Sequence, residues 1–241
     1  MSAPRVLIAT AVAAERDAVA AVLAGRPSFE VRAVGVGPAA AAAGTAFALA
    51  EAERSDLGAY ALVVSAGIGG GFPGLAPVGS LVVAERIVAA DLGAETPEGF
   101  ASVAELGFGA VEHLPPAALV RGLPGAVRGA VLTVSTVTGS ARRAAELRER
   151  CPGAVAEAME GFGVAEAAAR WGVPVLELRG ISNAVGPRDR GAWRIGEALA
   201  ALGQGCGALP AAVDAWLTGA VPGGERDGES DGESDEKERL R

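Results

Sequence analysis

Two carboxylates and one amide occupy positions in the sequence that are typical of catalytic or ligand-binding residues. Glu15 follows the apolar run Arg5–Thr10, Glu160 lies within an apolar stretch, and Asn183 follows the apolar run that begins at Val173. A carboxylate can act on a water molecule as a general base, and an amide offers an N–H donor beside a C=O acceptor. Each residue also has a structural explanation: an acid in the first turn of a helix, an acid on the exposed face of a helix, and an Asn in a turn.

A glycine-rich segment follows the third apolar run of the chain. Four of the five residues from Gly67 to Gly71 are glycines. Without Cβ atoms, such a segment lets backbone N–H groups approach a ligand closely. The spacing matches neither the dinucleotide fingerprint nor the phosphate-loop pattern that ends in Lys-Ser/Thr. The segment alone therefore does not name its ligand.

The composition argues against several classes of partner and cofactor. The formal net charge of -8, with no basic cluster, disfavours nucleic acid. No apolar run reaches the roughly 18 to 20 residues that a membrane span needs, and the N-terminus lacks the pattern of a signal peptide. The two cysteines, Cys151 and Cys206, can form neither a disulfide framework nor a zinc site, and the single His113 disfavours other metal sites. We expect a cytoplasmic protein without metal or cofactor that does not bind membranes.

Strand-like and helix-like segments alternate along the chain. This alternation predicts an α/β fold with a mainly buried sheet, in which ligands bind at the carboxyl ends of strands. Glu15, the glycine segment and Asn183 all follow predicted strands. The expected strands are Arg5–Thr10, Glu30–Val36, Ala59–Ser65, Gly79–Ile87, Ala130–Ser135 and Val173–Ile181, and the expected helices are Ala13–Leu23, Pro38–Arg54, Gly139–Arg150, Ala156–Trp171 and Gly191–Trp216.

The C-terminal segment differs in composition from the rest. From Gly223 to Arg241 it holds eight acidic and four basic residues, and Leu240 is its only large apolar side chain. Such a segment buries too little apolar surface to offset the entropy of ordering. We expect one domain over residues 1–221 and a disordered acidic tail over residues 222–241, for which a functional role is the alternative.

Taken together and in order, the segments resemble the nucleoside phosphorylase/nucleosidase superfamily, and within it the 5′-methylthioadenosine/S-adenosylhomocysteine nucleosidases. The resemblance spans nearly the whole chain except the tail. It implies a single domain with a mixed central β-sheet flanked by helices, a purine nucleoside as substrate, and a homodimer or larger homo-oligomer. The matching segments are Val6–Glu15, Gly35–Gly44, Ala66–Gly71, Val78–Val83, Met159–Gly161 and Arg179–Asn183.

The resemblance also implies roles for individual residues. Glu15 matches the carboxylate that activates water, and Met159 with Glu160 matches the pair that packs against the ribose and binds its hydroxyls. Trp193 falls where the family places an aromatic ring over the sugar. Further candidates for substrate binding are Ile68, Gly69, Gly70, Thr136 and Val137, together with Phe108 and Pro115, which fall near residues that a partner subunit contributes in the family.

One departure from the adenine-releasing enzymes bears on the base. Those enzymes carry Asp where this chain has Asn183, and a Glu where it has Ala158. The Asn183 amide suits a 6-oxopurine, whose O6 accepts a hydrogen bond while a protonated N7 donates one. A site built for one such pattern rejects the other because buried groups go unpaired. We expect hypoxanthine as the leaving base, with guanine as the lesser option, and a water or a nearby acid as the source of the N7 proton.

A second departure concerns the nucleophile. The related phosphorylases hold phosphate with an Arg-containing loop after the first strand, whereas the loop Thr10–Glu15 has no Arg poised for phosphate, and Arg16 would point elsewhere on a helix. A carboxylate repels phosphate and suits water, so we expect hydrolysis. A nucleosidase of this fold that releases hypoxanthine resembles the futalosine hydrolases of the futalosine route to menaquinone.

Four alternatives remain open at this stage: an adenine-releasing nucleosidase, a phosphorylase, a nucleoside-binding protein without catalysis, and, least favoured because it leaves the carboxylates at strand ends unexplained, a purely structural role. Futalosine carries a benzoate on its 5′ side, so its pocket needs a donor for a carboxylate. The candidates for that donor are Arg86, Arg142, Arg188 and His113, and the sequence does not choose between them.

Overall fold

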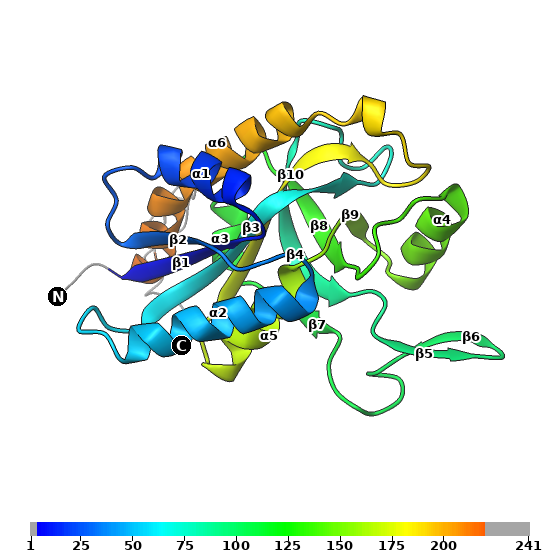
Figure 1. The fold of residues 1–241 in the computed structure, drawn as a ribbon, viewed down its shortest axis with the longest axis horizontal. Helices are drawn as coiled ribbons and strands as arrows, with labels where there is room; N and C mark the ends of the chain where they lie inside the picture. The colour runs from blue at the N-terminus through cyan, green and yellow to red at the C-terminus, as the bar shows by residue number, and fades with distance from the viewer. Residues whose placement is uncertain (1–3, 220–241) are drawn as a thin grey trace, which may run out of the picture.

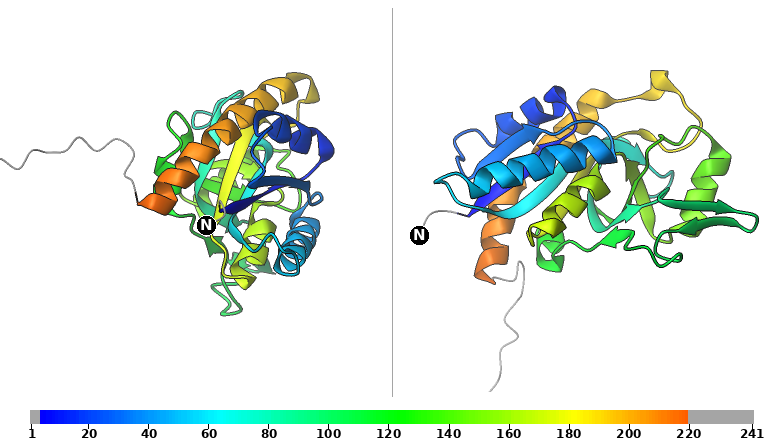
Figure 2. Two further views of the ribbon diagram at one scale, coloured as in Figure 1. Left: turned by 90° about the vertical axis from the view of Figure 1, so that its left-hand side faces the viewer. Right: turned by 60° about the horizontal axis from the view of Figure 1, so that its bottom comes forward.

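A mixed β-sheet of eight strands forms the centre of the molecule (Figure 1). The computed structural model describes residues 4–219, so the acidic tail expected over residues 222–241 lies outside the described residues. The strands of this sheet are β1 (Arg5–Thr10), β2 (Phe29–Ala33), β3 (Tyr60–Gly71), β4 (Leu81–Ala89), β7 (Glu112–His113), β8 (Val127–Thr133), β9 (Ala154–Ala158) and β10 (Val175–Ala184). Two further strands, β5 (Gly93–Thr96) and β6 (Gly99–Ser102), form a hairpin that projects from the body of the molecule (Figures 1 and 2).

The pairing pattern closes part of the sheet on itself. The strand order is β10-β4-β8-β9-β3-β1-β2, and β10 also pairs with β3, so five strands form a ring. Pairing is parallel for β1 with β2 and β3, for β10 with β3, for β4 with β8 and for β8 with β9, and antiparallel for β10 with β4, β3 with β9 and β4 with β7. The expectation of a mixed sheet is confirmed. Because β1, β3 and β10 run parallel, their carboxyl ends meet at one edge.

Helices cover both faces of the sheet, which explains the near-continuous apolar character of its strands. They are α1 (Ala13–Val22), α2 (Pro38–Glu53), α3 (Ala117–Arg121), α4 (Ala141–Arg150), α5 (Gly161–Arg170) and α6 (Ile195–Thr218), with a 3₁₀ turn η1 (Arg190–Ala192) before α6. In β1, Leu7 packs in a core with α2 and α5, whereas Val6 and Ile8 pack in a second core with α1, α3 and α6. Successive side chains of a strand point to opposite faces, so one strand serves both cores.

Three expectations about the elements were wrong at their boundaries. The helix expected over Ala156–Trp171 is two elements, because Ala154–Ala158 pairs with β3 and β8 as a fully buried strand before α5 begins. The strand expected to end at Ser65 continues to Gly71, because its glycines pair with β9 and β10. Likewise, β10 extends to Ala184, so Asn183 lies in a strand instead of a turn. Tertiary pairing overrides local preference in all three cases.

Candidate active site

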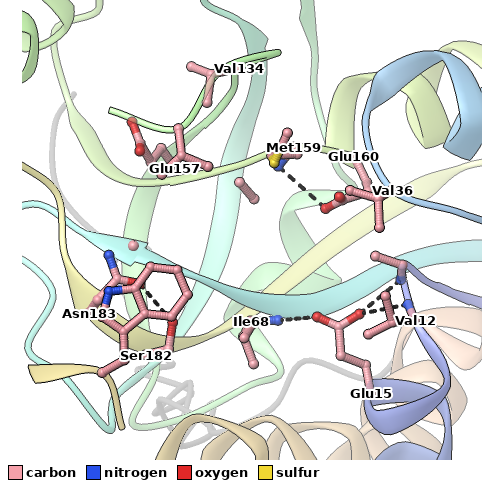
Figure 3. Close-up of a pocket in the computed structure, with 15 residues that line it drawn as sticks. Val12, Glu15, Val36, Ile68, Val134, Glu157, Met159, Glu160, Ser182 and Asn183 are labelled. Carbon is pink, nitrogen blue, oxygen red and sulfur yellow. Dashed lines mark hydrogen bonds between the residues drawn. The ribbon is translucent and has the colours of Figure 1, made fainter. Parts of the chain in front are cut away.

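One cavity gathers most of the residues singled out in the sequence. It opens where β1, β3, β9 and β10 come together, and Figure 3 shows it in close-up. Eight of the sequence-predicted residues line it: Glu15, Ile68, Gly70, Val137, Met159, Glu160, Asn183 and Trp193. The other seven lining residues carry no role predicted from the sequence; they are Ala11, Val12, Val36, Val134, Glu157, Ala158 and Ser182.

Four predicted residues do not line this cavity. Gly69 alternates with Ile68 and Gly70 along β3, so its position faces the other side of the strand. Thr136 is exposed beside Val137. Phe108 is 82% exposed and Pro115 is buried elsewhere; both were expected to reach the pocket of a partner subunit, and this single chain does not test that expectation.

The Glu15 carboxylate is buried and held by three backbone N–H groups. Its Oε2 accepts hydrogen bonds from the N–H of Ala11 at 2.9 Å and of Val12 at 3.3 Å, and its Oε1 accepts one from the N–H of Ile68 at 2.9 Å. These bonds tie the start of α1 to β3. A carboxylate has about four acceptor positions, so one remains on Oε1 for a water molecule.

Glu160 sits immediately before α5 and is also buried, so the explanation of an acid on an exposed helix face is wrong. Its Oε1 accepts from the N–H of Gly37 at 3.2 Å. Its Oε2 accepts from the N–H of Met159 at 3.3 Å and from Nη1 of Arg179, also at 3.3 Å. The carboxylate keeps acceptor capacity on the side of the cavity.

A buried guanidinium that was not predicted from the sequence, that of Arg179, joins Glu160 to Glu177 and Ser65. Arg179 is 1% exposed and donates from Nε to Glu177 at 2.9 Å and from Nη2 to the Ser65 hydroxyl at 2.9 Å, in addition to its bond to Glu160. Burial alone lowers the pKa of Arg179, but the carboxylates of Glu177, Glu160 and Glu15 outweigh it and raise the pKa. Arg179 therefore stays charged and balances the buried acids.

Glu177 is the fully buried carboxyl that pairs with Arg179. Burial raises the pKa of its carboxyl, and Arg179 opposes the rise. The signal was present in the sequence, since Glu177 and Arg179 are two residues apart in an apolar strand and must share one face. Charged residues are almost never fully buried unless paired, so this pair pointed to a buried network.

Asn183 lies at the other end of the cavity, and its amide is oriented by neighbours. Its Oδ1 accepts from the hydroxyl of Ser182 at 2.8 Å, and its Nδ2 donates to the carbonyl of Ala184 at 3.0 Å. One acceptor position on Oδ1 and one N–H on Nδ2 remain for a ligand. This is the pairing that N7–H and O6 of a protonated 6-oxopurine require.

A third carboxyl, Glu157, lines the same cavity. It comes from β9 and is 3% exposed. Its Oε1 accepts from the N–H of Thr138 at 2.8 Å. Burial raises the pKa of Glu157, and the hydrogen bond from the N–H of Thr138 opposes the rise. Glu157 could have been noticed as an acid within the apolar strand sequence Ala154–Ala158.

The polar groups divide between two ends of an otherwise apolar cavity. Figure 3 shows Glu15 and Glu160 toward one end and Asn183 with Glu157 toward the other. The first pair suits a water molecule and sugar hydroxyls, and the second suits a planar base with several donors and acceptors. Among residues 4–219, no group of three His, Cys, Asp or Glu side chains could hold a metal ion.

The candidates for binding a 5′ carboxylate all lie away from the cavity lining. Arg86 pairs with Glu112 at 3.0 Å, Arg142 pairs with Glu146 at 3.5 Å, and His113 lies 2.9 Å from Glu166. Arg188 is exposed.

Within residues 4–219, no helix has the length and apolar character needed to cross a membrane.

Comparison with known proteins places the chain in a family. A family profile described as the phosphorylase superfamily matches residues 9–216. A futalosine hydrolase of Streptomyces coelicolor is 61% identical over 228 residues, which cover 87% of this chain and 97% of the relative. The chain belongs to the futalosine hydrolase family. A second member, from Acidothermus cellulolyticus, is 44% identical over 88% of this chain and 92% of the relative.

Solved structures show the same fold at lower identity. An S-adenosylhomocysteine nucleosidase of Streptococcus pyogenes superposes with a TM-score of 0.74 at 18% identity, covering 87% of this chain and 97% of that one. A 5′-methylthioadenosine/S-adenosylhomocysteine nucleosidase of Colwellia psychrerythraea gives a TM-score of 0.68 at 20% identity, covering 91% and 96%. The expectation of a nucleoside phosphorylase-like fold for this futalosine hydrolase family member is confirmed.

Proposed function

We propose that the protein hydrolyses the N-glycosidic bond of futalosine and releases hypoxanthine and dehypoxanthine futalosine, a step of menaquinone biosynthesis. The observation that carries the proposal is the 61% identity to a futalosine hydrolase over 97% of that relative. The cavity supports it independently, because carboxylates lie at one end and an amide suited to a 6-oxopurine lies at the other.

In the proposed mechanism, Glu15 orients the attacking water and takes its proton. The bond between C1′ and N9 breaks, its electron pair passes to the purine, and N7 receives a proton from a water molecule or a nearby acid. Hydroxide from the attacking water adds to C1′, and the proton that Glu15 took from this water then passes to solvent, which restores the carboxylate. The free acceptor position on Oε1 of Glu15 supports this role, since three N–H groups hold the carboxylate in place around it.

Glu160 is assigned to the ribose. Its carboxylate accepts hydrogen bonds from the 2′- and 3′-hydroxyls, and its charge stabilises the positive charge that develops on the sugar. The bonds from Gly37, Met159 and Arg179 support this assignment because they fix the carboxylate at the cavity wall. Met159 and Trp193, which line the cavity, supply apolar contact with the sugar.

Water, not phosphate, is the proposed nucleophile. None of the described residues that line the cavity is Arg or Lys. Arg179 lies behind the wall, with its guanidinium bonded to Glu177, Glu160 and Ser65. A phosphate dianion at this end would face the carboxylates of Glu15 and Glu160 without a cation to offset the repulsion.

A homo-oligomer belongs to the same proposal, with Phe108 and Pro115 contributed to the pocket of the partner subunit. The exposure of Phe108 at 82% and of Leu114 at 69% supports a covered surface around residues 106–115, because large apolar side chains that gather on one surface mark interaction sites. The cytoplasmic location expected from the sequence stays a prediction.

The test is to offer the purified protein three nucleosides and identify the free base by chromatography. Futalosine, inosine and 5′-methylthioadenosine are each incubated separately at equal concentration. We expect hypoxanthine from futalosine, less or none from inosine, and no adenine from methylthioadenosine. Adenine release as the main activity would overturn the proposal in favour of an adenine nucleosidase.

A further inference from the structure

The proposed mechanism leaves one buried acid of the cavity without a role. Glu157 has one oxygen bonded to the N–H of Thr138, whereas its Oε2 is buried and has no hydrogen-bond partner among residues 4–219. A buried polar atom without a partner is destabilising, and such atoms are rare in native proteins. Because Glu157 lines the cavity, a ligand can supply the missing partner.

The backbone places Glu157 beside Asn183 on the two sides of one glycine. Gly70 of β3 pairs with Glu157 of β9 on one side and with Asn183 of β10 on the other. A Cβ atom built on Gly70 would lie 3.6 Å from Cγ of Glu157 and 3.3 Å from Nδ2 of Asn183. Both side chains therefore lie on the same face of the sheet, on either side of Gly70, where the nearest atom to such a Cβ would be Cγ2 of Val185 at 2.9 Å.

We propose that Glu157 reads the six-membered ring of the purine, with its carboxylate accepting the hydrogen bond of N1–H while Asn183 binds N7 and O6. This inference rests on the proposed function, because it concerns the base of the same substrate. In a 6-oxopurine, O6 lies between N7 and N1 on the ring edge. Glu157 and Asn183 lie at the same end of the cavity, away from Glu15 and Glu160 (Figure 3), so a base whose N7 and O6 meet Asn183 has its N1 in the part of the cavity that Glu157 lines.

The chemistry makes Glu157 a specificity-determining residue. N1 of hypoxanthine carries a hydrogen, whereas N1 of adenine carries a lone pair. An ionised carboxylate attracts the first and repels the second, so the same group favours one base and rejects the other. Without Glu157, the site would recognise the purine only through the hydrogen bonds of Asn183 with N7 and O6.

Protonation of the Glu157 carboxylate would reverse this preference for hypoxanthine over adenine. Burial raises the pKa of Glu157, Thr138 and the Arg143 guanidinium oppose the rise, and the Asp91 carboxylate adds to it. Below that raised pKa the neutral carboxyl donates a hydrogen bond, which suits N1 of adenine. The preference for hypoxanthine over adenine is therefore expected to fall as the pH falls through the pKa of Glu157.

The first experiment compares wild type with Glu157→Gln and with a control, Glu85→Gln, which makes the same change at an exposed Glu of β4. The Gln keeps an oxygen for the N–H of Thr138 and directs an N–H to N1. The readout is the ratio of kcat/KM for futalosine to kcat/KM for its 6-aminopurine counterpart. We expect Glu157→Gln to lower this ratio by about tenfold or more, and Glu85→Gln to leave it unchanged.

The second readout is the pH dependence of the same ratio. Both substrates share the same water attack and the same ribose contacts, so a pH effect on those common steps cancels in the ratio. We expect the ratio to fall toward acidic pH in wild type and to stay flat in Glu157→Gln. If Glu157 only anchored the Thr138 backbone, its replacement by Gln would change neither the ratio nor the pH profile of the ratio.

A third measurement does not depend on turnover or on a folded variant. The Kd values of free hypoxanthine and free adenine for the wild-type protein are measured by calorimetry across the same pH range, and their ratio is expected to shift in the same direction. A ratio independent of pH, or a folded Glu157→Gln with the wild-type preference, would overturn the role of Glu157. A wild-type protein that releases no hypoxanthine from futalosine would instead overturn the proposed function.

Discussion

At the scale of single residues, the hydrogen bonds to Glu15 decide what its carboxylate can do. Three backbone N–H groups hold it, and one acceptor position is left over. A Gln at this position has a single acceptor oxygen and an NH₂ group, which would face N–H donors and could not take a proton from water.

We therefore expect Glu15→Gln to lose at least about two orders of magnitude in kcat, because a positioned general base contributes about 10²–10⁴ in rate. Binding of futalosine should persist, since the pocket walls are unchanged. The kcat is measured by hypoxanthine release and the Kd by calorimetry, with Glu85→Gln as the control. Near-normal turnover in Glu15→Gln would rule out its role as the base.

Loss of the buried Arg179 guanidinium should destabilise the fold. Replacing it by Met leaves Glu177 and Glu160 buried without their cation, and breaking a buried ion pair on one side destabilises by about 3–5 kcal/mol. The free energy of unfolding is measured in urea. Arg142→Met, at a side chain that is 86% exposed, is the control and should change stability by less than about 0.5 kcal/mol. Equal stability of the two variants would contradict the network described here.

Glu15 and Asn183 could be singled out from the sequence because each follows an apolar run, and Glu160 because it lies within an apolar stretch. The family resemblance of the ordered segments then grouped the three as one predicted site. Arg179 and Glu157 were missed because their importance comes from partners distant in the sequence. The bond from Arg179 to Ser65 spans 114 positions, and Glu157 meets Asn183 only across β3. Their one local signal, a charge inside an apolar strand, does not say what the charge contacts.

At the scale of elements, the glycines of β3 allow the backbone of this strand to approach the Glu15 carboxylate and the Arg179 guanidinium closely. A Cβ atom on Gly67 would lie 2.4 Å from Nη1 of Arg179 and 2.8 Å from Oε1 of Glu15. The sequence indicated a close approach of the backbone here, but the strand was expected to end at Ser65, because glycine disfavours strands. The strand forms because β9 and β10 pair with it from both sides.

We expect Gly67→Ala to reduce kcat/KM at least tenfold, because the methyl group must displace Glu15 or Arg179 from its place. Gly207→Ala is the matched control, since a Cβ atom there would meet nothing within 4 Å. Both variants are assayed for hypoxanthine release and for thermal unfolding. Wild-type activity in Gly67→Ala would show that the carboxylate and the guanidinium tolerate displacement.

At the scale of the whole molecule, the alternation of strands and helices was enough to predict the α/β class, but not the closure of the sheet. Closure requires β10 to pair with β3 and β4 at once. Those pairings join segments far apart in the chain, and no local pattern encodes them. The hairpin β5–β6 was also missed, since its four-residue strands carry little apolar periodicity.

The exposed apolar surface around Phe108 gives a prediction at this scale. If it is covered by a second subunit, Phe108→Asp should weaken self-association and lower activity, because burying an unpaired charge in an interface is unfavourable. The molar mass is measured by light scattering over a range of protein concentrations. Phe47→Asp, at another exposed Phe (61% exposed) on α2, is the control. The same mass for wild type and Phe108→Asp would remove this surface from the interface.

We have proposed that the protein hydrolyses futalosine with water as the nucleophile. The most direct measurement is to incubate the purified protein with futalosine, with and without added phosphate, and to identify both products by mass spectrometry. We predict hypoxanthine and dehypoxanthine futalosine in equal amounts at a rate that phosphate does not change. A sugar 1-phosphate, or release that requires phosphate, would contradict the account.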